Sequence, residues 1–272
     1  MTSGRSYAEV IGDPIAHSKS PLIHRHWLDK LGIDGDYRAV HVTAEALPAY
    51  VTARRDDPSW RGCNVTIPHK EAVLAHVSDP GGIRHSIGAA NTLFRSGGEL
   101  ICTNTDAAGF FAPIADANLA GAAVVVVGAG GAARAVLFAL AQIGVGSVTI
   151  LNRNVLKASA LLAHFGLKGR ALPLDAELPP AVLLVNASSL GMKGQPSLDL
   201  DLSPLPDEAI VYDLVYAPIE TALLAAAGAR GLEVIDGLEM LIGQAAVAFE
   251  LFFGAPPPDD PADELRALLL AA

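Results

Sequence analysis

Four consecutive valines, Val124–Val127, run directly into the glycine-rich segment GAGGAARA, and this junction constrains the fold more than any other part of the chain. A β-branched apolar run predicts a buried strand, and the glycines after it predict a tight turn into a helix. Gly128, Gly130 and Ala133 spell G-x-G-x-x-A at that turn. In this context the motif is typical of dinucleotide-binding domains, where the glycines allow the turn and the approach of a pyrophosphate. A tight turn without a ligand is the alternative interpretation.

Apolar strands alternate with helical segments on both sides of this junction. Beyond residue 122 the expected strands are uniformly apolar, at residues 123–127, 147–151, 182–186, 210–214 and 233–235. Such strands are covered on both faces, as in a parallel doubly wound sheet. Earlier strands are expected at residues 8–12, 37–42 and 63–67, with a hairpin of 90–95 and 99–103 whose turn is SGG. Helices are expected to begin near Pro21, Ala44 and Pro68, because proline is tolerated in a first helical turn.

Composition excludes several classes of protein. The chain has 272 residues, 51% of them hydrophobic, which is enough for two domains. A formal net charge of −10 disfavours nucleic acid and anionic lipid as partners. Cys63 and Cys102 match no metal-ligand spacing and indicate buried thiols in a reducing compartment, so we expect a cytoplasmic protein. Residues 118–152 are hydrophobic enough to suggest a membrane span, but the predicted strand and glycine turn argue against one.

The next strand ends in Asn152-Arg153-Asn154, where NAD-binding domains place an acidic residue on the ribose. A guanidinium at that point suits the 2′-phosphate of NADP, and Lys157, one helical turn on, adds a second cation. A solvated pair of surface cations is the alternative.

Polar side chains at several strand ends of the first half suggest a polyol-binding cleft. In GDPIAHSKSP, Ser20 is expected to cap a helix that begins at Pro21, and Ser18 with Ser20 suits a carboxylate equally well. In NVTIPHKE, Lys70 is expected in a first helical turn, where a cation is disfavoured. It therefore reaches solvent, gains from Glu71, or is placed there for proton transfer. The loops AANTL and TNTDAAG bring further Asn, Thr and Asp to strand ends.

Nine blocks in this order and spacing resemble the shikimate dehydrogenase family over nearly the whole chain: GDPIAHSKSP, NVTIPHKE, GAANTL, NTDAAGF, GAGGAARA, NR, NASSLGM, DLVYAP and GLEMLIGQAAVAFELFFG. The resemblance implies an α/β fold with an N-terminal substrate domain of residues 1–105 and 238–272, to which the C-terminal helices return. It implies a Rossmann-type, doubly wound dinucleotide-binding domain of residues 106–237. The implied activity is NADP-dependent interconversion of 3-dehydroshikimate and shikimate, in aromatic amino acid biosynthesis. We expect a monomer or homodimer, and no metal, because no cluster of His, Cys or carboxylate residues has ligand spacing.

The resemblance also implies roles for individual residues. Lys70 and Asp106 would be the catalytic pair. Substrate would be bound by Ser18, Ser20, Thr66, Asn91, Tyr216 and Gln244. NADP would be bound by Gly128, Ala129, Gly130, Gly131, Ala132, Asn152, Arg153, Lys157, Ser188, Leu214 and Gly237. From its sequence context alone, Gln244 is a buried polar residue on a core helix.

Four departures from the family pattern are His69, Cys102, Ser188 and Glu239, none of which replaces a proposed catalytic group. His69 and Glu239 bear on the choice between shikimate, quinate and related acids, because both change polarity near the expected site. Two alternatives stay open at this stage. One is an NAD-dependent quinate/shikimate dehydrogenase, against which Arg153 argues; the other is a catalytically silent dinucleotide-binding protein.

Overall fold

The computed structural model describes residues 5–260 and 262–272, and these divide into two compact units. The first unit comprises the described residues up to Thr105 and the segment Ile242–Ala272. The second unit is the uninterrupted segment Asp106–Leu241. None of the helices that the structure describes combines the length and the apolar character needed to cross a membrane.

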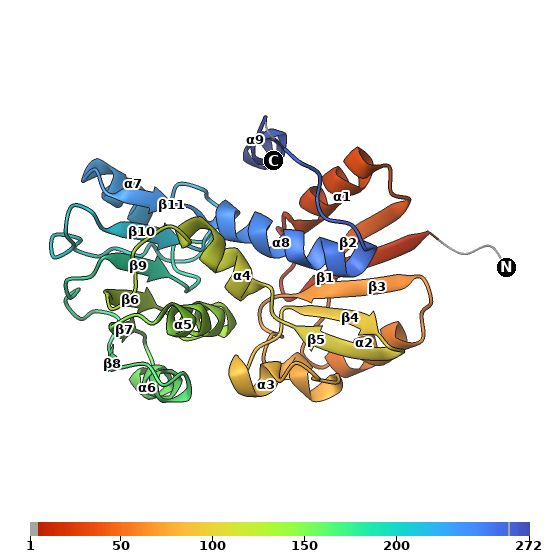
Figure 1. The fold of residues 1–272 in the computed structure, drawn as a ribbon, viewed down its shortest axis with the longest axis horizontal. Helices are drawn as coiled ribbons and strands as arrows, with labels where there is room; N and C mark the ends of the chain where they lie inside the picture. Colours follow the sequence, from red (N-terminus) through yellow and green to blue (C-terminus); the bar gives the residue numbers. More distant parts are fainter. Residues whose placement is uncertain (1–4, 261) are drawn as a thin grey trace. The chain divides into compact units, whose positions relative to one another are not determined.

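The first unit is built on a five-stranded sheet in the order β2-β1-β3-β4-β5 (Figure 1). Its strands are β1 (Ser6–Gly12), β2 (Gly35–His41), β3 (Trp60–Val65), β4 (Thr92–Ser96) and β5 (Glu99–Thr103). β1 pairs in parallel with β2 and β3, whereas β3, β4 and β5 are antiparallel. The predicted hairpin is confirmed. Gly97 and Gly98 form its turn with φ of 59° and 83°, the two positive values that a two-residue type I′ turn needs.

The helices of the first unit are α1 (Ser20–Leu31), α2 (Leu47–Arg55) and α3 (Ile83–Ser86), with a 3₁₀ helix, η1, at Ala72–His76. The helix expected to begin near Pro68 is wrong, because residues 67–71 form a turn that leads into η1. In an α-helix the Lys70 carbonyl would accept from Leu74; here it accepts from the N–H of Ala90, at 2.8 Å. The electrostatic argument about Lys70, which assumed that this residue lies in a first helical turn, therefore does not apply.

Two C-terminal helices complete the first unit, as expected for segments that return to it. They are α8 (Gly237–Phe253), of which residues from Ile242 onward belong to this unit, and α9 (Glu264–Ala271). Ala248 and Phe252 on α8 pack into one core cluster with Val10 of β1 and Tyr37 of β2. α9 lies against α1.

The second unit carries a six-stranded sheet in the order β11-β10-β9-β6-β7-β8, with every pair parallel. The strands are β6 (Ala123–Val127), β7 (Ser147–Leu151), β8 (Gly169–Leu172), β9 (Leu183–Asn186), β10 (Ile210–Asp213) and β11 (Glu233–Ile235). This is the 3-2-1-4-5-6 order of a doubly wound dinucleotide-binding sheet, so the predicted fold class is confirmed. β8 was not predicted, because its four residues include a glycine and an arginine.

The helices of this unit are α4 (Asp106–Phe111), α5 (Gly131–Ile143), α6 (Val155–His164) and α7 (Ala222–Ala229), with a 3₁₀ helix, η2, at Ala112–Ile114. Side chains of α5 and α6 join the core cluster on one face of the sheet. On the other face, α7 is joined by loop residues such as Leu198 and Leu205. The expectation of a helical segment between every pair of strands is wrong for residues 173–182 and 187–209, whose prolines prevent continuous helices.

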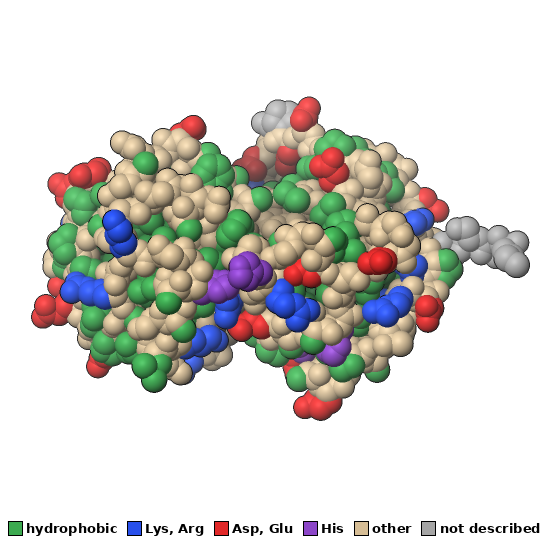
Figure 2. All heavy atoms as spheres, turned by 60° about the horizontal axis from the view of Figure 1, so that its bottom comes forward, with side chains coloured by type: hydrophobic (Ala, Val, Ile, Leu, Met, Phe, Trp, Pro, Cys, Tyr) green, Lys and Arg blue, Asp and Glu red, His purple; other side chains and the backbone are tan. Residues whose placement is uncertain are grey.

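Charged side chains are distributed in small groups over the face drawn in Figure 2, with acidic and basic residues interspersed. The basic side chains on that face do not gather into one continuous area.

Candidate active site

The glycine turn after β6 has the geometry of a ligand-binding turn. Gly128 has φ +109°, and a Cβ there would lie 2.8 Å from the carbonyl oxygen of Ala187, so only glycine fits. At Gly130, by contrast, no atom lies within 4 Å of a built Cβ, which leaves the backbone open to a ligand. Gly130 precedes the first turn of α5, whose N–H groups have no partner within the helix. Ala133, the last residue of the motif, is buried in the core against the sheet.

Two cations lie at the same edge of the sheet as the glycine turn. Val127 of β6 pairs with Leu151 of β7, and the N–H of Gly128 donates to the Leu151 carbonyl at 2.9 Å. Asn152, Arg153 and Asn154 follow at once, and the Asn154 side chain caps α6 by accepting from the N–H of Lys157 at 3.0 Å. The side chains of Arg153 and Lys157 are exposed. This edge therefore presents the N-terminal N–H groups of a helix beside two exposed cations, a combination suited to a pyrophosphate and a further phosphate.

A buried carboxylate that sequence reasoning missed joins two loops at the carboxyl edge of β9 and β10. Asp213 is 0% exposed and accepts hydrogen bonds from Asn186 at 2.8 Å, from Thr221 at 2.7 Å and from the N–H of Val215 at 3.0 Å. Burial raises the pKa of Asp213, while these hydrogen bonds act in the opposite direction. The signal available in the sequence was the polar residue at the end of each of two apolar strands.

Two of the proposed cofactor residues lie on the loops that this carboxylate joins, and a third lies beside them. Ser188 donates its hydroxyl to Asn186 at 2.7 Å, and the N–H of Leu214 donates to the Asn186 carbonyl at 3.0 Å. Gly237, the first residue of α8, approaches this loop so closely that a Cβ would lie 2.6 Å from the Leu214 oxygen. Tyr216 follows on the same loop, where burial raises its pKa. The structure therefore brings Ser188, Leu214 and Gly237 together.

In the first unit, Asn91 is the centre of a buried polar cluster. It is 2% exposed and donates to the Thr105 hydroxyl at 2.9 Å and to the Gln244 side-chain oxygen at 3.3 Å. The N–H of Thr105 donates back to Asn91 at 2.7 Å. Asn91 and Gln244, two of the predicted site residues, are thus brought together across 153 residues of sequence. Thr105 belongs to the same cluster and was not predicted.

Ser18 and Ser20 lie at the start of α1, but their local roles differ from those expected. The expectation that Ser20 caps the helix is wrong, since Lys19 occupies the N-cap and Ser20 is the first helical residue. The N–H of Ser20 donates to the Ser18 hydroxyl at 3.3 Å. The Ser20 side chain is buried without serving as a cap, which favours a role other than helix initiation.

Thr66 and Lys70 follow β3 at the same edge of the sheet. The loop between β1 and α1, residues 13–19, contains Ser18 and is called the serine loop. Thr66 lies close to its start, because the Thr66 methyl group would be 2.6 Å from a Cβ at Gly12. The hydrogen bond between the Lys70 carbonyl and the N–H of Ala90 places Lys70 beside the residue that precedes Asn91. Asp106 is the first residue of α4 and follows Thr105 directly. Each member of the predicted catalytic pair is therefore linked through the backbone to the Asn91 cluster.

The departures from the family pattern have structural explanations. The His69 imidazole is buried and bonds the carbonyl of Val42, the residue that follows β2, at 2.6 Å, so this ring nitrogen is engaged within the protein. Cys102 is buried on β5. Glu239 lies in the first turn of α8, where a carboxylate complements the helix dipole.

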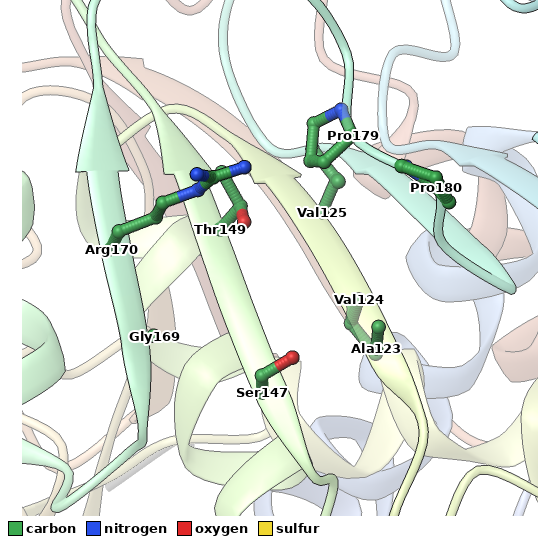
Figure 3. A pocket seen from close by; sticks show the side chains of 9 residues that line it. All are labelled: Ala123, Val124, Val125, Ser147, Thr149, Gly169, Arg170, Pro179 and Pro180. Carbon is green, nitrogen blue, oxygen red and sulfur yellow. The ribbon is translucent and has the colours of Figure 1, made fainter. Parts of the chain in front are cut away.

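A separate pocket of about 300 Å³ lies over β6, β7 and β8 in the second unit (Figure 3). Its lining includes Ala123, Ser147 and Gly169, the first residues of those three strands, together with Arg170, Pro179 and Pro180. Ligands of doubly wound sheets bind at the carboxyl ends of the strands, so this pocket is at the wrong end of the sheet to be the active site. Within the described residues, no group of three or more His, Cys, Asp or Glu side chains is arranged to hold a metal ion.

The doubly wound unit, its open glycine turn and the polar cluster of the other unit define a dinucleotide-dependent oxidoreductase that acts on a small polar substrate. Models of known protein families match three segments of the chain, and their descriptions are more specific than this general class. "Shikimate dehydrogenase substrate binding domain" matches residues 10–93, "Shikimate / quinate 5-dehydrogenase" residues 112–180, and "Shikimate 5'-dehydrogenase C-terminal domain" residues 237–265.

Known proteins match over almost the whole chain. A shikimate dehydrogenase (NADP(+)) of Sphingopyxis alaskensis is 70% identical over 97% of both chains. Another from Rhodopseudomonas palustris strain HaA2 is 50% identical over 98% of this chain and 96% of that protein. The shikimate 5-dehydrogenase of Thermus thermophilus, solved with NADP(H) and shikimate, has a TM-score of 0.85 and 40% identity, covering 97% of this chain and 100% of that one. The chain belongs to the shikimate dehydrogenase family.

Proposed function

We propose that this protein is an NADP-dependent oxidoreductase that interconverts 3-dehydroshikimate and shikimate in the biosynthesis of aromatic amino acids. The exposed Arg153 beside the glycine turn is the structural observation that carries the cofactor choice. The substrate choice is supported by the 70% identity to the Sphingopyxis alaskensis enzyme over 97% of both chains. We further propose that the protein is cytoplasmic and acts as a monomer or homodimer.

The two units divide the work between substrate and cofactor. Residues 1–105 and the C-terminal helices would bind the substrate, and the unit that contains the parallel sheet would bind NADP. The boundary inferred from sequence, at residue 238, differs slightly from that of the compact units, which falls between Leu241 and Ile242 within α8. Gly237 therefore belongs to the cofactor unit on either division.

The cofactor would be held at the carboxyl edge of β6, β7, β9 and β10. The N–H groups of Gly130, Gly131 and Ala132, at the start of α5, are suited to the pyrophosphate. Arg153 and Lys157 are suited to the 2′-phosphate. When bound, NADP supplies the hydride acceptor or donor, and the loops that contain Ser188, Leu214 and Gly237 would position its nicotinamide end. Closing the site to water would protect the reaction.

Substrate would be oriented by hydrogen bonds from the first unit. Ser18 and Ser20 would bind its carboxylate, and the cluster of Asn91 and Gln244, with Thr66, would bind ring hydroxyls. These amides are already buried and mutually hydrogen-bonded, so little ordering is needed on binding. Tyr216 would be a further substrate-binding residue.

Lys70 would perform the proton transfer. During oxidation its side chain would take the proton of the reacting hydroxyl, and during reduction it would return that proton. Asp106 would orient Lys70 and the substrate. The backbone links of Lys70 to Ala90 and of Asp106 to Thr105 support this assignment, because both lead to the cluster that would bind the neighbouring hydroxyls.

The test is a matrix of steady-state assays, with shikimate or quinate combined with NADP or NAD and reduced nicotinamide absorbance as the signal. We expect shikimate with NADP to give the highest kcat/KM. A preference for quinate with NAD would support the rival activity, which is that of the quinate dehydrogenase of Corynebacterium glutamicum, 30% identical to this chain with a TM-score of 0.84. NADP binding without turnover of either acid would identify a catalytically silent protein.

One further arm uses 5-ketofructose with NADPH, because a 5-ketofructose reductase of Gluconobacter has a TM-score of 0.86 and 30% identity to this chain. Turnover of this neutral sugar at a rate matching that of 3-dehydroshikimate would contradict a site built around a carboxylate.

A further inference from the structure

Helix α9, at the far end of the chain, is tied to α1 at both of its ends. Near its start, Glu264 forms an ion pair with Lys30, in the last turn of α1. Near its end, the carbonyl of Leu269 accepts a hydrogen bond from the Lys19 ammonium at 2.6 Å. The two helices therefore run antiparallel, and Leu265 and Leu269 are the buried residues of α9. Figure 1 shows α9 beside α1.

Lys19 stands between the two serines that we assign to the substrate carboxylate. From its position in the sequence, an ammonium between two hydroxyls would be the obvious partner for that carboxylate. The structure instead directs it to the carboxyl end of α9, where the last four carbonyls of a helix lack intrahelical partners and carry partial negative charge. This contact also compensates for the unfavourable place of a cation at the N-cap of α1.

The hydrogen bond from Lys19 to the Leu269 carbonyl affects the geometry of the serine loop directly. Lys19 is the N-cap residue, so its backbone determines where Ser18 leaves the loop and where Ser20 enters the helix. The hydrogen bond from the Ser20 N–H to the Ser18 hydroxyl, which links the two serines directly, is long at 3.3 Å. A bond of that length is too weak to fix the two hydroxyls by itself. The shorter bond from Lys19 to Leu269 is the stronger restraint.

We propose that Lys19 is a positioning residue, which holds the hydroxyls of Ser18 and Ser20 in place for the substrate carboxylate by anchoring their loop to the end of α9. The inference rests on the proposed function, because it assumes that the serines bind a carboxylate. It makes the last helix of the chain part of the carboxylate subsite, although α9 supplies no group to the substrate.

The test compares substitutions at the two ends of the same helix pair. Lys19→Met keeps the apolar stem and removes the donor, and Lys30→Met does the same at the other end. We expect Lys19→Met to raise the KM for shikimate about tenfold, the effect of losing a well-placed hydrogen bond to a charged group. The kcat and the KM for NADP should change by less than about twofold. Lys19→Arg, which retains a donor, should restore the KM to near the wild-type value.

Lys30→Met is the matched control, because it loosens α9 at the end away from the serines. If α9 merely stabilised the fold, both methionine variants would lower the melting temperature and neither would change the KM selectively. A double-mutant cycle with Ser18→Ala adds a second readout. Lys19 acts through Ser18, so we expect the two effects on KM to be clearly less than additive. Additive effects would mean that the ammonium binds substrate directly, and would overturn the proposal.

Leu269→Ala perturbs the same contact between Lys19 and α9, but from the α9 side. It keeps the proposal testable if Lys19→Met does not fold. We expect it to raise the KM for shikimate as well, since it loosens the helix end that holds Lys19. An unchanged KM in both Lys19→Met and Leu269→Ala, with a raised KM in Ser18→Ala, would refute this inference and leave the proposed function standing. An unchanged KM in Ser18→Ala would instead refute the carboxylate assignment on which it rests.

Discussion

The imidazole of His24 lies in the core of the first unit without a hydrogen-bond partner. It is 0% exposed and stacks on the Tyr37 ring, with centroids 3.9 Å apart and planes 2° apart. Trp27 and Phe249 also contact it edge-on or tilted. Within the part of the chain that the structure describes, neither ring nitrogen finds a partner. Burial lowers the pKa of His24 to about 3.

This depressed pKa makes stability depend on pH in a defined window. Below its ordinary value of 6.5 the unfolded chain binds a proton at His24, whereas the folded chain does not until about pH 3. The unfolded state binds more protons in that window, so stability rises with pH there and falls on acidification. The slope is about 1.4 kcal/mol per pH unit, so His24 should remove roughly 3 kcal/mol of stability between pH 7 and pH 4.

The decisive variant is His24→Phe, which retains a planar ring against Tyr37 and removes both nitrogens. We expect the difference in unfolding free energy, variant minus wild type, to grow by roughly 3 kcal/mol from pH 7 to pH 4. The difference at pH 7 is less informative, because two effects oppose each other there. Removing the unsatisfied nitrogens stabilises the variant, whereas the larger volume of phenylalanine destabilises it. Urea unfolding at four pH values between these limits measures the difference, in which all other titrating groups cancel.

His85→Gln is the control, because it removes an exposed imidazole from α3. It measures how much of any change in pH dependence comes from removing an imidazole at the surface. A constant difference between His24→Phe and wild type from pH 7 to pH 4 would refute the account, since it would mean that His24 is protonated equally readily in the folded and unfolded chains.

Four further expectations concern the proposed site. Lys70→Ala should lower kcat by roughly a hundredfold or more with little change in the KM for shikimate, and its loss should not add to that of Asp106→Asn; retention of more than half the turnover would dismiss Lys70 as the proton carrier. Ser18→Ala should weaken shikimate binding by about 1 to 3 kcal/mol without changing the melting temperature, as measured by titration and thermal unfolding. Arg153→Ala should raise the KM for NADP by roughly 10-fold to 150-fold and leave that for NAD unchanged, with an effect that shrinks as salt is added; unaltered NADP kinetics would reassign the cofactor. Asp213→Asn should lower the free energy of unfolding by roughly 3 kcal/mol, because a buried side chain that accepts three hydrogen bonds would become partly a donor. Chemical denaturation measures this loss, and a much smaller value would mean that the fold does not depend on the network.

Hydrophobic periodicity and turn residues were sufficient to predict most strands, and to predict that both halves of the chain are α/β. The valines of β6 and the glycines after them specify both a strand and its exit, and Gly97-Gly98 specifies a hairpin, because these signals are local. β8 was missed because it is a short, partly exposed edge strand that is defined by its pairing with β7 rather than by its own composition.

Errors arose where tertiary hydrogen bonds override local preference. The segment after Pro68 has a helix-start pattern, but the carbonyl of Lys70 pairs with Ala90, a residue distant in sequence, and the helix does not form. Ser20 was assigned a capping role that depends on backbone geometry one residue earlier. Gln244 had no signal of its own, since its partner Asn91 lies in another segment, and only the family resemblance indicated that they belong together. Thr105 and Asp213 do stand at strand ends, but their hydrogen-bond partners Asn91 and Asn186 lie in other segments, so their position alone did not identify them.

The division of the chain into one continuous and one split unit determines the order in which the two can be completed during synthesis. All of the second unit has left the ribosome once Leu241 emerges, so its parallel sheet can close while translation continues. The first unit emerges earlier yet must wait, because Val10 and Tyr37 lack their packing partner until Phe252 is made, and Asn91 lacks Gln244. We therefore expect the part of the protein made first to be the last to mature, which leaves its apolar sheet face exposed to chaperones throughout the synthesis of the cofactor unit.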